Sequence, residues 1–146
     1  MANPESIVVA CVDEMIKSVG LVPSFAGKVL HVYSEEELSV KLKGLSYPCA
    51  AVVYDGMTSV LATGGGIGAS GAMVLSVMVF FRMNTVATTD PKETILAMLD
   101  SLRKQIRKAK SPTGHSWQFL NEAPAQGKTG ILAYVQRWST PVQLVG

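Results

Sequence analysis

Charged residues are scarce in this chain, and the few charges nearly cancel. Only 16% of the 146 residues are Asp, Glu, Lys or Arg, whereas about 25% is usual for soluble domains. The 13 basic and 11 acidic side chains leave a formal net charge of +2. A net charge this small gives no argument for nucleic-acid binding by itself. With 48% hydrophobic residues, we expect part of the surface to be buried against other proteins.

The sequence also lacks an apolar run long enough to cross a membrane. The longest candidate, Ala72–Phe81, falls well short of the ~18 residues that a spanning helix needs. The first residues, MANPESIVV, carry no basic segment of the kind that opens a secretory signal peptide. We therefore expect no membrane anchor, no signal peptide and no membrane partner.

Cysteine and histidine are rare, and the sequence contains none of the usual metal-binding or redox motifs that use them. Cys11 and Cys49 form no C-x-x-C pair, and His31 and His115 have no acidic or cysteine partner at ligand spacing. We interpret the cysteines as small buried hydrophobic residues in a reducing compartment. We predict no metal site, no cofactor and no catalytic residue.

The first third of the chain predicts a helix, a strand and a second helix. Asn3-Pro4-Glu5 is typical of a helix start, and apolar residues then recur at helical spacing as far as Gly20. Val29–Tyr33 is typical of a strand. Ser34 opens a capping box, so we expect a short helix between Ser34 and Gly44.

Two apolar segments dominate the middle of the chain. Cys49–Tyr54 is apolar throughout and predicts a buried strand, and Asp55-Gly56 after it is typical of a turn. Met73–Met83 is rich in Val, Met and Phe, which favours a long buried strand, although its periodicity also allows a helix. Between them lies a glycine-rich stretch, and we expect a long mobile loop over Thr63–Ala72.

The last part of the chain predicts a helix and a β-hairpin. Asp90-Pro91 is a strong helix start. The apolar stripe of this helix consists of Ile95, Met98, Leu99, Leu102 and Ile106. Trp117–Leu120 and Ile131–Thr140 are typical of two strands joined by a turn. Pro141 is expected to interrupt the second strand and to leave a short tail over 141–146.

Met57–Ala62 is half-apolar and is a further strand candidate, given in parentheses in the order α β α β (β) β α β β. Helices are partly segregated from strands in this order. That order predicts an α+β fold with a single mixed or antiparallel β-sheet, helices packed mainly on one face, and a C-terminal β-hairpin. Because no linker or internal repeat is visible, we expect residues 1–146 to form a single domain.

The segment Gly66–Gly71 fits G-x-G-x-x-G, the fingerprint of dinucleotide-binding sites. That fingerprint works only between a strand and a helix, because the helix N-terminus holds the pyrophosphate. Here a β-like segment follows, and the acid near the expected distance, Asp90, caps a helix instead. We favour a loop without a ligand and keep a small nucleotide-binding protein or enzyme as the alternative.

Two other motifs are incomplete. Gly68–Ala72 is one position away from G-x-S-x-G, which also needs a helix after its serine, although Asp100 and His115 follow in hydrolase order. Gly127-Lys128-Thr129 matches the end of a Walker A motif, but Glu122 stands where that motif requires glycine. A hairpin turn explains the second motif without phosphate chemistry.

Cations gather in the last turns of the third helix. The residues that would face nucleic acid are Arg103, Lys104, Arg107 and Lys108. No aromatic residues interleave with them, and cations at this end of a helix also favour its dipole. A nucleic-acid-binding adaptor is therefore a second alternative.

The order of segments along the whole chain resembles that of a known protein family. An amphipathic helix leads to SYPCAAVVYDG, a glycine-rich insertion leads to SVMVFFRM, and the capped helix TDPKETILAMLDSLRKQI leads to WQFLNEAP and GILAYVQRWSTPV. This pattern resembles the tail terminator proteins of tailed bacteriophages, in the tail-completion and neck family, over about Ser6–Pro141. The shared pieces are a proline before an apolar strand and a final strand with Tyr134, Ser139 and Thr140. The glycine content of the insertion and the VQLVG tail depart from the family pattern.

The resemblance implies a structural virion protein without catalysis or a cofactor. Such proteins form hexameric rings that cap the tail tube, end its polymerisation and join the tail to the neck or connector. The implied partners are further copies of the chain, the tail tube protein, the neck or connector protein and, in contractile tails, the sheath. Genomic DNA is only passing cargo. The implied location is the virion tail or neck, assembled in the cytoplasm of the bacterial host.

We expect two segments to contact neighbouring subunits or the tube. A flexible loop can become ordered on docking, and a short tail can add a strand to another sheet. The expected interface residues are Thr63, Gly64, Gly65, Gly66, Ile67, Gly68, Ala69, Ser70, Gly71, Val142, Gln143 and Leu144.

Overall fold

The computed structural model describes residues 4–32, 35–42, 44, 46–60, 70–82, 91–125 and 130–143. The helices are α1 (Pro4–Gly20), α2 (Glu35–Leu42) and α3 (Pro91–Lys108), with a short 3-10 turn, η1 (Pro23–Phe25). The strands are β1 (Val29–Val32), β2 (Cys49–Val60), β3 (Ser70–Arg82), β4 (Gln118–Ala125) and β5 (Ile131–Gln143).

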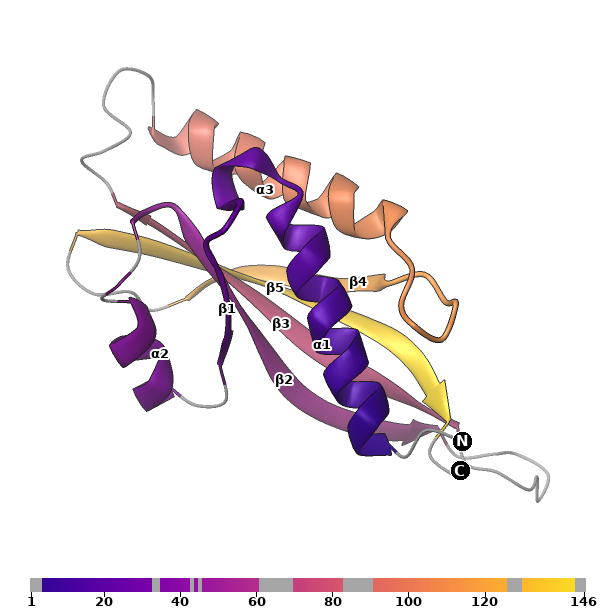
Figure 1. The fold of residues 1–146 in the computed structure, drawn as a ribbon. Coiled ribbons are helices and arrows are strands. Elements are labelled where there is room, and N and C mark those ends of the chain that lie inside the picture. The colour runs from indigo at the N-terminus through magenta and orange to yellow at the C-terminus, as the bar shows by residue number, and fades with distance from the viewer. Residues whose placement is uncertain are drawn as a thin grey trace.

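The described strands form one five-stranded sheet in the order β1-β2-β3-β5-β4 (Figure 1). β1 pairs with β2 in parallel, and the other three pairings are antiparallel. β3 and β5 are paired along their whole lengths and form the centre of the sheet. The sheet is therefore mixed, and β4 and β5 form the expected C-terminal hairpin, which confirms the predicted α+β class.

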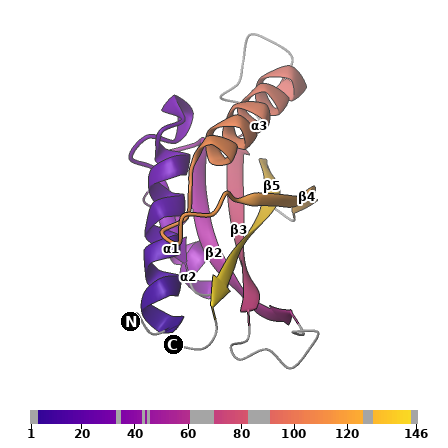
Figure 2. The ribbon, with the colours of Figure 1, turned by 90° about the vertical axis from the view of Figure 1, so that its right-hand side faces the viewer.

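The larger core lies between one face of the sheet and helices α1 and α3. Both helices present apolar stripes at helical spacing to this core, because residues three and four apart share one helix face. Its fully buried members include Val12, Met15, Val19, Leu99, Leu102 and Ile106 from the helices, and Met73, Leu75, Val77 and Trp138 from the strands. Figure 2 shows α1 and α3 along one side of the sheet. The stripe predicted for the third helix is confirmed.

A smaller core lies on the opposite face, under α2. Strand side chains alternate between faces, so Cys49 and Ala51 belong to this second cluster while Ala50 and Val52 belong to the first. Leu38 and Leu42 of α2 are packed against it. The helices thus lie mainly on one face, as predicted, and α2 packs on the other face, where it contacts β1.

The predicted turn at Asp55-Gly56 is wrong, because β2 continues through it. Tyr54 pairs with Leu75 and Gly56 pairs with Val74, so Asp55 is the extra residue of a β-bulge. Gly56 has a φ of 116°, which glycine adopts far more readily than other residues. β3 supplies a partner along the whole segment, and this long pairing outweighs the local turn signal.

The predicted interruption at Pro141 is also wrong, because β5 continues to Gln143. Pro141 lies opposite Ala72 of β3, while β4 reaches only as far as Ser139 of β5. The carbonyl of Pro141 accepts a hydrogen bond from Thr113 Oγ1 at 3.4 Å. The polar backbone groups of Pro141 therefore face away from β3, so its missing N–H interrupts no ladder there.

Both cysteines are buried, as predicted, and they lie on opposite sides of the sheet. Cys11 of α1 belongs to the larger core and Cys49 of β2 to the smaller one. Both are free thiols. Burial raises the pKa of each thiol to about 11, and Glu14 adds to this effect at Cys11. Both cysteines are therefore inert packing groups at neutral pH.

Candidate assembly surfaces

In the sequence, the glycine-rich stretch lies between β2 and β3. Most of its expected interface residues, namely Thr63, Gly64, Gly65, Gly66, Ile67, Gly68 and Ala69, lie outside the described residues. Ser70 and Gly71 do not belong to a loop. They begin β3, where Ser70 pairs with Val60 and Gln143, and Gly71 with Ser59 and Val142.

The segment after the glycines is a strand, as predicted. The G-x-G-x-x-G fingerprint therefore lacks the helix N-terminus that would hold a pyrophosphate. The same strand leaves Ser70 without the helix that follows a nucleophile elbow. Asp100 forms ion pairs with Lys104 and Arg103, which lower its pKa, and His115 is exposed in the loop after α3.

The expected interface role of the tail needs a correction at Val142. Its side chain is 4% exposed and belongs to the larger core, so it is not available to another chain. Gln143 already pairs with Ser70 of β3. The extension of β3 gives the end of β5 a partner within the chain. Leu144 lies outside the described residues.

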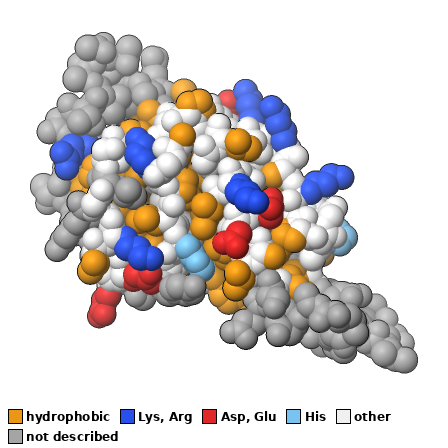
Figure 3. All heavy atoms as spheres, viewed as in Figure 1, with side chains coloured by type: hydrophobic (Ala, Val, Ile, Leu, Met, Phe, Trp, Pro, Cys, Tyr) orange, Lys and Arg blue, Asp and Glu red, His pale blue; other side chains and the backbone are white. Residues whose placement is uncertain are grey.

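The basic residues near the end of α3 divide into two groups. Arg103 Nη1 lies 2.5 Å from Glu122 Oε1, and Lys104 Nζ lies 3.1 Å from Asp100 Oδ2. Arg107 and Lys108 are exposed and form no ion pair with another described residue. Half of the predicted nucleic-acid-facing set is therefore engaged within the chain. Figure 3 shows cations along the upper right of the molecule, where Figure 1 places this end of α3.

Glu122 belongs to a network of polar side chains between α3 and the sheet. In the sequence, Glu122 stood out only as the residue that makes the Walker A motif incomplete. Gln136 of β5 is fully buried and donates Nε2 to Glu122 Oε1 at 2.7 Å and to the Leu99 carbonyl at 3.1 Å. Glu122 also accepts the bond from Arg103. The network joins α3, β4 and β5. Sequence reasoning missed it because no short-range pattern relates residues this far apart.

Part of the second sheet face carries none of the helices that the structure describes. The cluster under α2 crosses the sheet at Cys49, Phe80, Ala133 and Ala125, and along β2 and β3 it extends to Val53 and Met78. Beyond it, the face continues over Val74 and Ser76 of β3 and Val135 and Arg137 of β5, together with Asp55 at the bulge of β2. We call these five residues the uncovered face. Figure 2 shows no helix on that side of β3 and β5.

The polar groups of the uncovered face satisfy one another. Ser76 is 4% exposed and donates its hydroxyl hydrogen to Asp55 Oδ2. Arg137 Nε lies 3.5 Å from the same oxygen. Val74 and Val135 remain half-buried and belong to neither core. The face is thus mostly small, apolar or internally paired, which suits contact with another protein.

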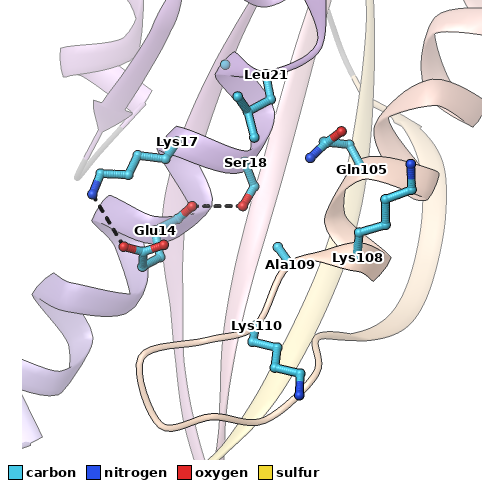
Figure 4. A pocket seen from close by; sticks show the side chains of 9 residues that line it. Glu14, Lys17, Ser18, Leu21, Gln105, Lys108, Ala109 and Lys110 are labelled. Carbon is cyan, nitrogen blue, oxygen red and sulfur yellow. Dashed lines mark hydrogen bonds and ion pairs between the residues drawn. The ribbon is translucent and has the colours of Figure 1, made fainter.

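A groove of about 580 Å³ lies between the C-terminal ends of α1 and α3. Its lining residues are Glu14, Lys17, Ser18, Gly20, Leu21, Gln105, Lys108, Ala109 and Lys110. In Figure 4, Leu21 of the α1 side lies opposite Gln105 and Ala109, while the Ser18 hydroxyl donates to the Glu14 carbonyl and Lys17 turns toward the Glu14 carboxylate. We call this feature the α1–α3 groove.

Among the described residues, no group of three or more His, Cys, Asp and Glu side chains could hold a metal ion. The helices in the described ranges also include none that is both long and apolar enough to span a bilayer. No protein-family model matches the chain, and no curated protein matches it in sequence.

Proposed function

We propose that this chain is a structural assembly protein, the subunit of a ring that caps a bacteriophage tail tube. The ring, of six copies, ends polymerisation of the tube and joins the tail to the neck or connector. The proposal starts from the resemblance to tail terminator proteins, which implies a small sheet with helices packed against it. The fold described above has that form.

The observation that carries the proposal is the uncovered face. Val74 and Val135 lie on the central strands of the sheet, where a single-chain protein normally covers apolar residues with a helix or a second sheet. Self-association or contact with a tube would cover them instead. The ion pair of Asp55 with Arg137 leaves no net charge at this place to oppose burial.

Ring assembly also accounts for the composition of the chain. A closed ring is built from heterologous contacts, so each subunit buries two different surfaces. Several large apolar side chains project from separate parts of the subunit. The most exposed of them are Val9, Leu21, Val40, Leu96 and Leu120. Burial of some of them between subunits would remove apolar surface from water in a chain with so few charges.

Negative-stain electron microscopy of the purified protein tests this proposal. We expect rings in the free protein and rings on the ends of tail tubes. Val135→Asp places a charge on the uncovered face, so it should abolish rings or their attachment to tubes. Ala97→Asp adds the same charge at an exposed position of α3 that belongs to no proposed contact, and it is the matched control. If the two variants assemble equally well, the uncovered face is not an assembly surface and the proposal loses its support.

A further inference from the structure

The α1–α3 groove combines an exposed apolar side chain with unpaired cations. Leu21 stands at its edge and is 67% exposed. Lys108 and Lys110, on the α3 side, form no ion pair with another described residue. The remaining charges of the lining, Lys17 and Glu14, pair with each other at 3.4 Å. The groove therefore carries a net positive charge beside an apolar lip (Figure 4).

The outer side of α2 has the complementary character. Val40 is 68% exposed. Glu36 precedes it by four residues, so the two share one side of the helix, and Glu36 is also exposed. Lys41 does not neutralise Glu36, because its Nζ lies 2.6 Å from Glu37 and donates to the His31 carbonyl at 3.1 Å. α2 thus presents an apolar side chain together with a carboxylate that forms no ion pair with another described residue.

These two surfaces belong to opposite sides of the same subunit. α2 is packed against the smaller core, whereas α1 and α3 cover the larger core on the other face of the sheet. In Figure 3 acidic side chains project at the lower left, where Figure 1 places α2, far from the cations of α3. One chain cannot bring the two surfaces together, but two copies in a head-to-tail arrangement can.

We propose that α2 of one copy docks into the α1–α3 groove of the next copy. Val40 contacts Leu21 and Ala109, and Glu36 pairs with Lys108 and Lys110. The positive N-terminal end of α2 also meets the negative C-terminal ends of α1 and α3. This inference rests on the proposed ring, and it names the two different surfaces that a heterologous ring contact requires.

Charge reversal with light scattering and electron microscopy tests the contact. Glu36→Lys should reduce the fraction of protein in rings at least tenfold, and Lys108→Glu with Lys110→Glu should do the same. The triple variant restores opposite charges and should recover most of the rings. Asp13→Lys, an exposed position on α1 outside the groove, makes the same charge change and should assemble like the wild type.

The outcomes separate this inference from the proposed function. If the wild-type protein forms rings but the charge reversals leave them intact, or if the triple variant fails to recover them, the contact is wrong and the ring stands. If the wild-type protein forms no ring, either free in solution or on the ends of tail tubes, the proposed function itself is wrong. If rings are lost in each charge reversal and recovered in the triple variant, the result supports both the proposed contact and the proposed function.

Discussion

Arg137 of β5 reaches over β3 to Asp55 of β2, with 3.5 Å between Nε and Oδ2. The same carboxylate accepts the hydroxyl of Ser76, which lies between them on β3. Asp55 is the extra residue of the bulge in β2, so the bulge places its side chain for this contact. The bulge in β2 thus places one carboxylate where it links β2, β3 and β5 on the uncovered face.

Removing Asp55 should cost more stability than removing Arg137. Asp55→Ala leaves the buried Ser76 hydroxyl without its acceptor, so we expect a loss of about 1–2 kcal/mol in the free energy of unfolding. Arg137→Ala removes only a half-exposed ion pair and should cost less than about 1 kcal/mol. Urea unfolding of both variants checks the difference. Equal losses would mean that the Ser76 bond contributes nothing.

Gln136 should stabilise the sheet through the two hydrogen bonds that its Nε2 group donates. Gln136→Leu leaves the Leu99 carbonyl without its side-chain donor and removes one partner of Glu122. We expect a loss of about 1–3 kcal/mol in the free energy of unfolding. Gln118→Leu, at an exposed position on neighbouring β4, is the control and should change stability by less than about 0.5 kcal/mol. The network has no structural role if the two variants unfold alike.

Truncation of two leucines of α3 should change the free energy of unfolding by very different amounts. Leu102 is fully buried in the larger core, so Leu102→Ala should destabilise the protein by about 2–5 kcal/mol. Leu96 is 57% exposed, and Leu96→Ala should have little effect on the free energy of unfolding of the single chain. Thermal or urea unfolding under non-assembling conditions measures both. A large loss for Leu96→Ala alone would contradict the orientation of α3.

The buried thiols predict a fall in stability at alkaline pH. Their pKa values are raised from 9.0 to about 11 in the folded chain, so the folded state holds these protons more tightly than the unfolded state. This contribution is complete below pH 9 and is lost as the pH rises toward 11. Urea unfolding across that interval should show a steeper decline for the wild type than for Cys11→Ala with Cys49→Ala. Parallel declines would show that the thiols do not titrate differently on unfolding.

The sequence predicted most elements of the fold because their signals are local. The start at Pro4, the end at Gly20 and the apolar stripe of α3 follow from helix spacing and capping alone. The bulge at Asp55 and the continuation of β5 through Pro141 depend on partners in β3 and on the loop residue Thr113. Such partners come from distant segments, so local patterns gave the wrong result there.

The candidate surfaces were less predictable than the fold. The cations of α3 are visible in the sequence, but their division into paired Arg103 and unpaired Lys108 depends on Glu122 of a distant strand. The uncovered face depends on how far along β2, β3 and β5 the smaller core extends. The segment that contains Val142 follows a proline near the end of the sequence, which is typical of a free tail. Because β3 begins as early as Ser70, it pairs with this segment, and Val142 lies in the larger core.

The mass of the assembly in solution tests the central claim most directly. Size-exclusion chromatography with light scattering, followed by electron microscopy of the same fraction, gives both the number of copies and their arrangement. The proposed function predicts a closed ring with six times the mass of one chain. A protein that remains a monomer at every concentration, and that attaches to no tail tube, would contradict it.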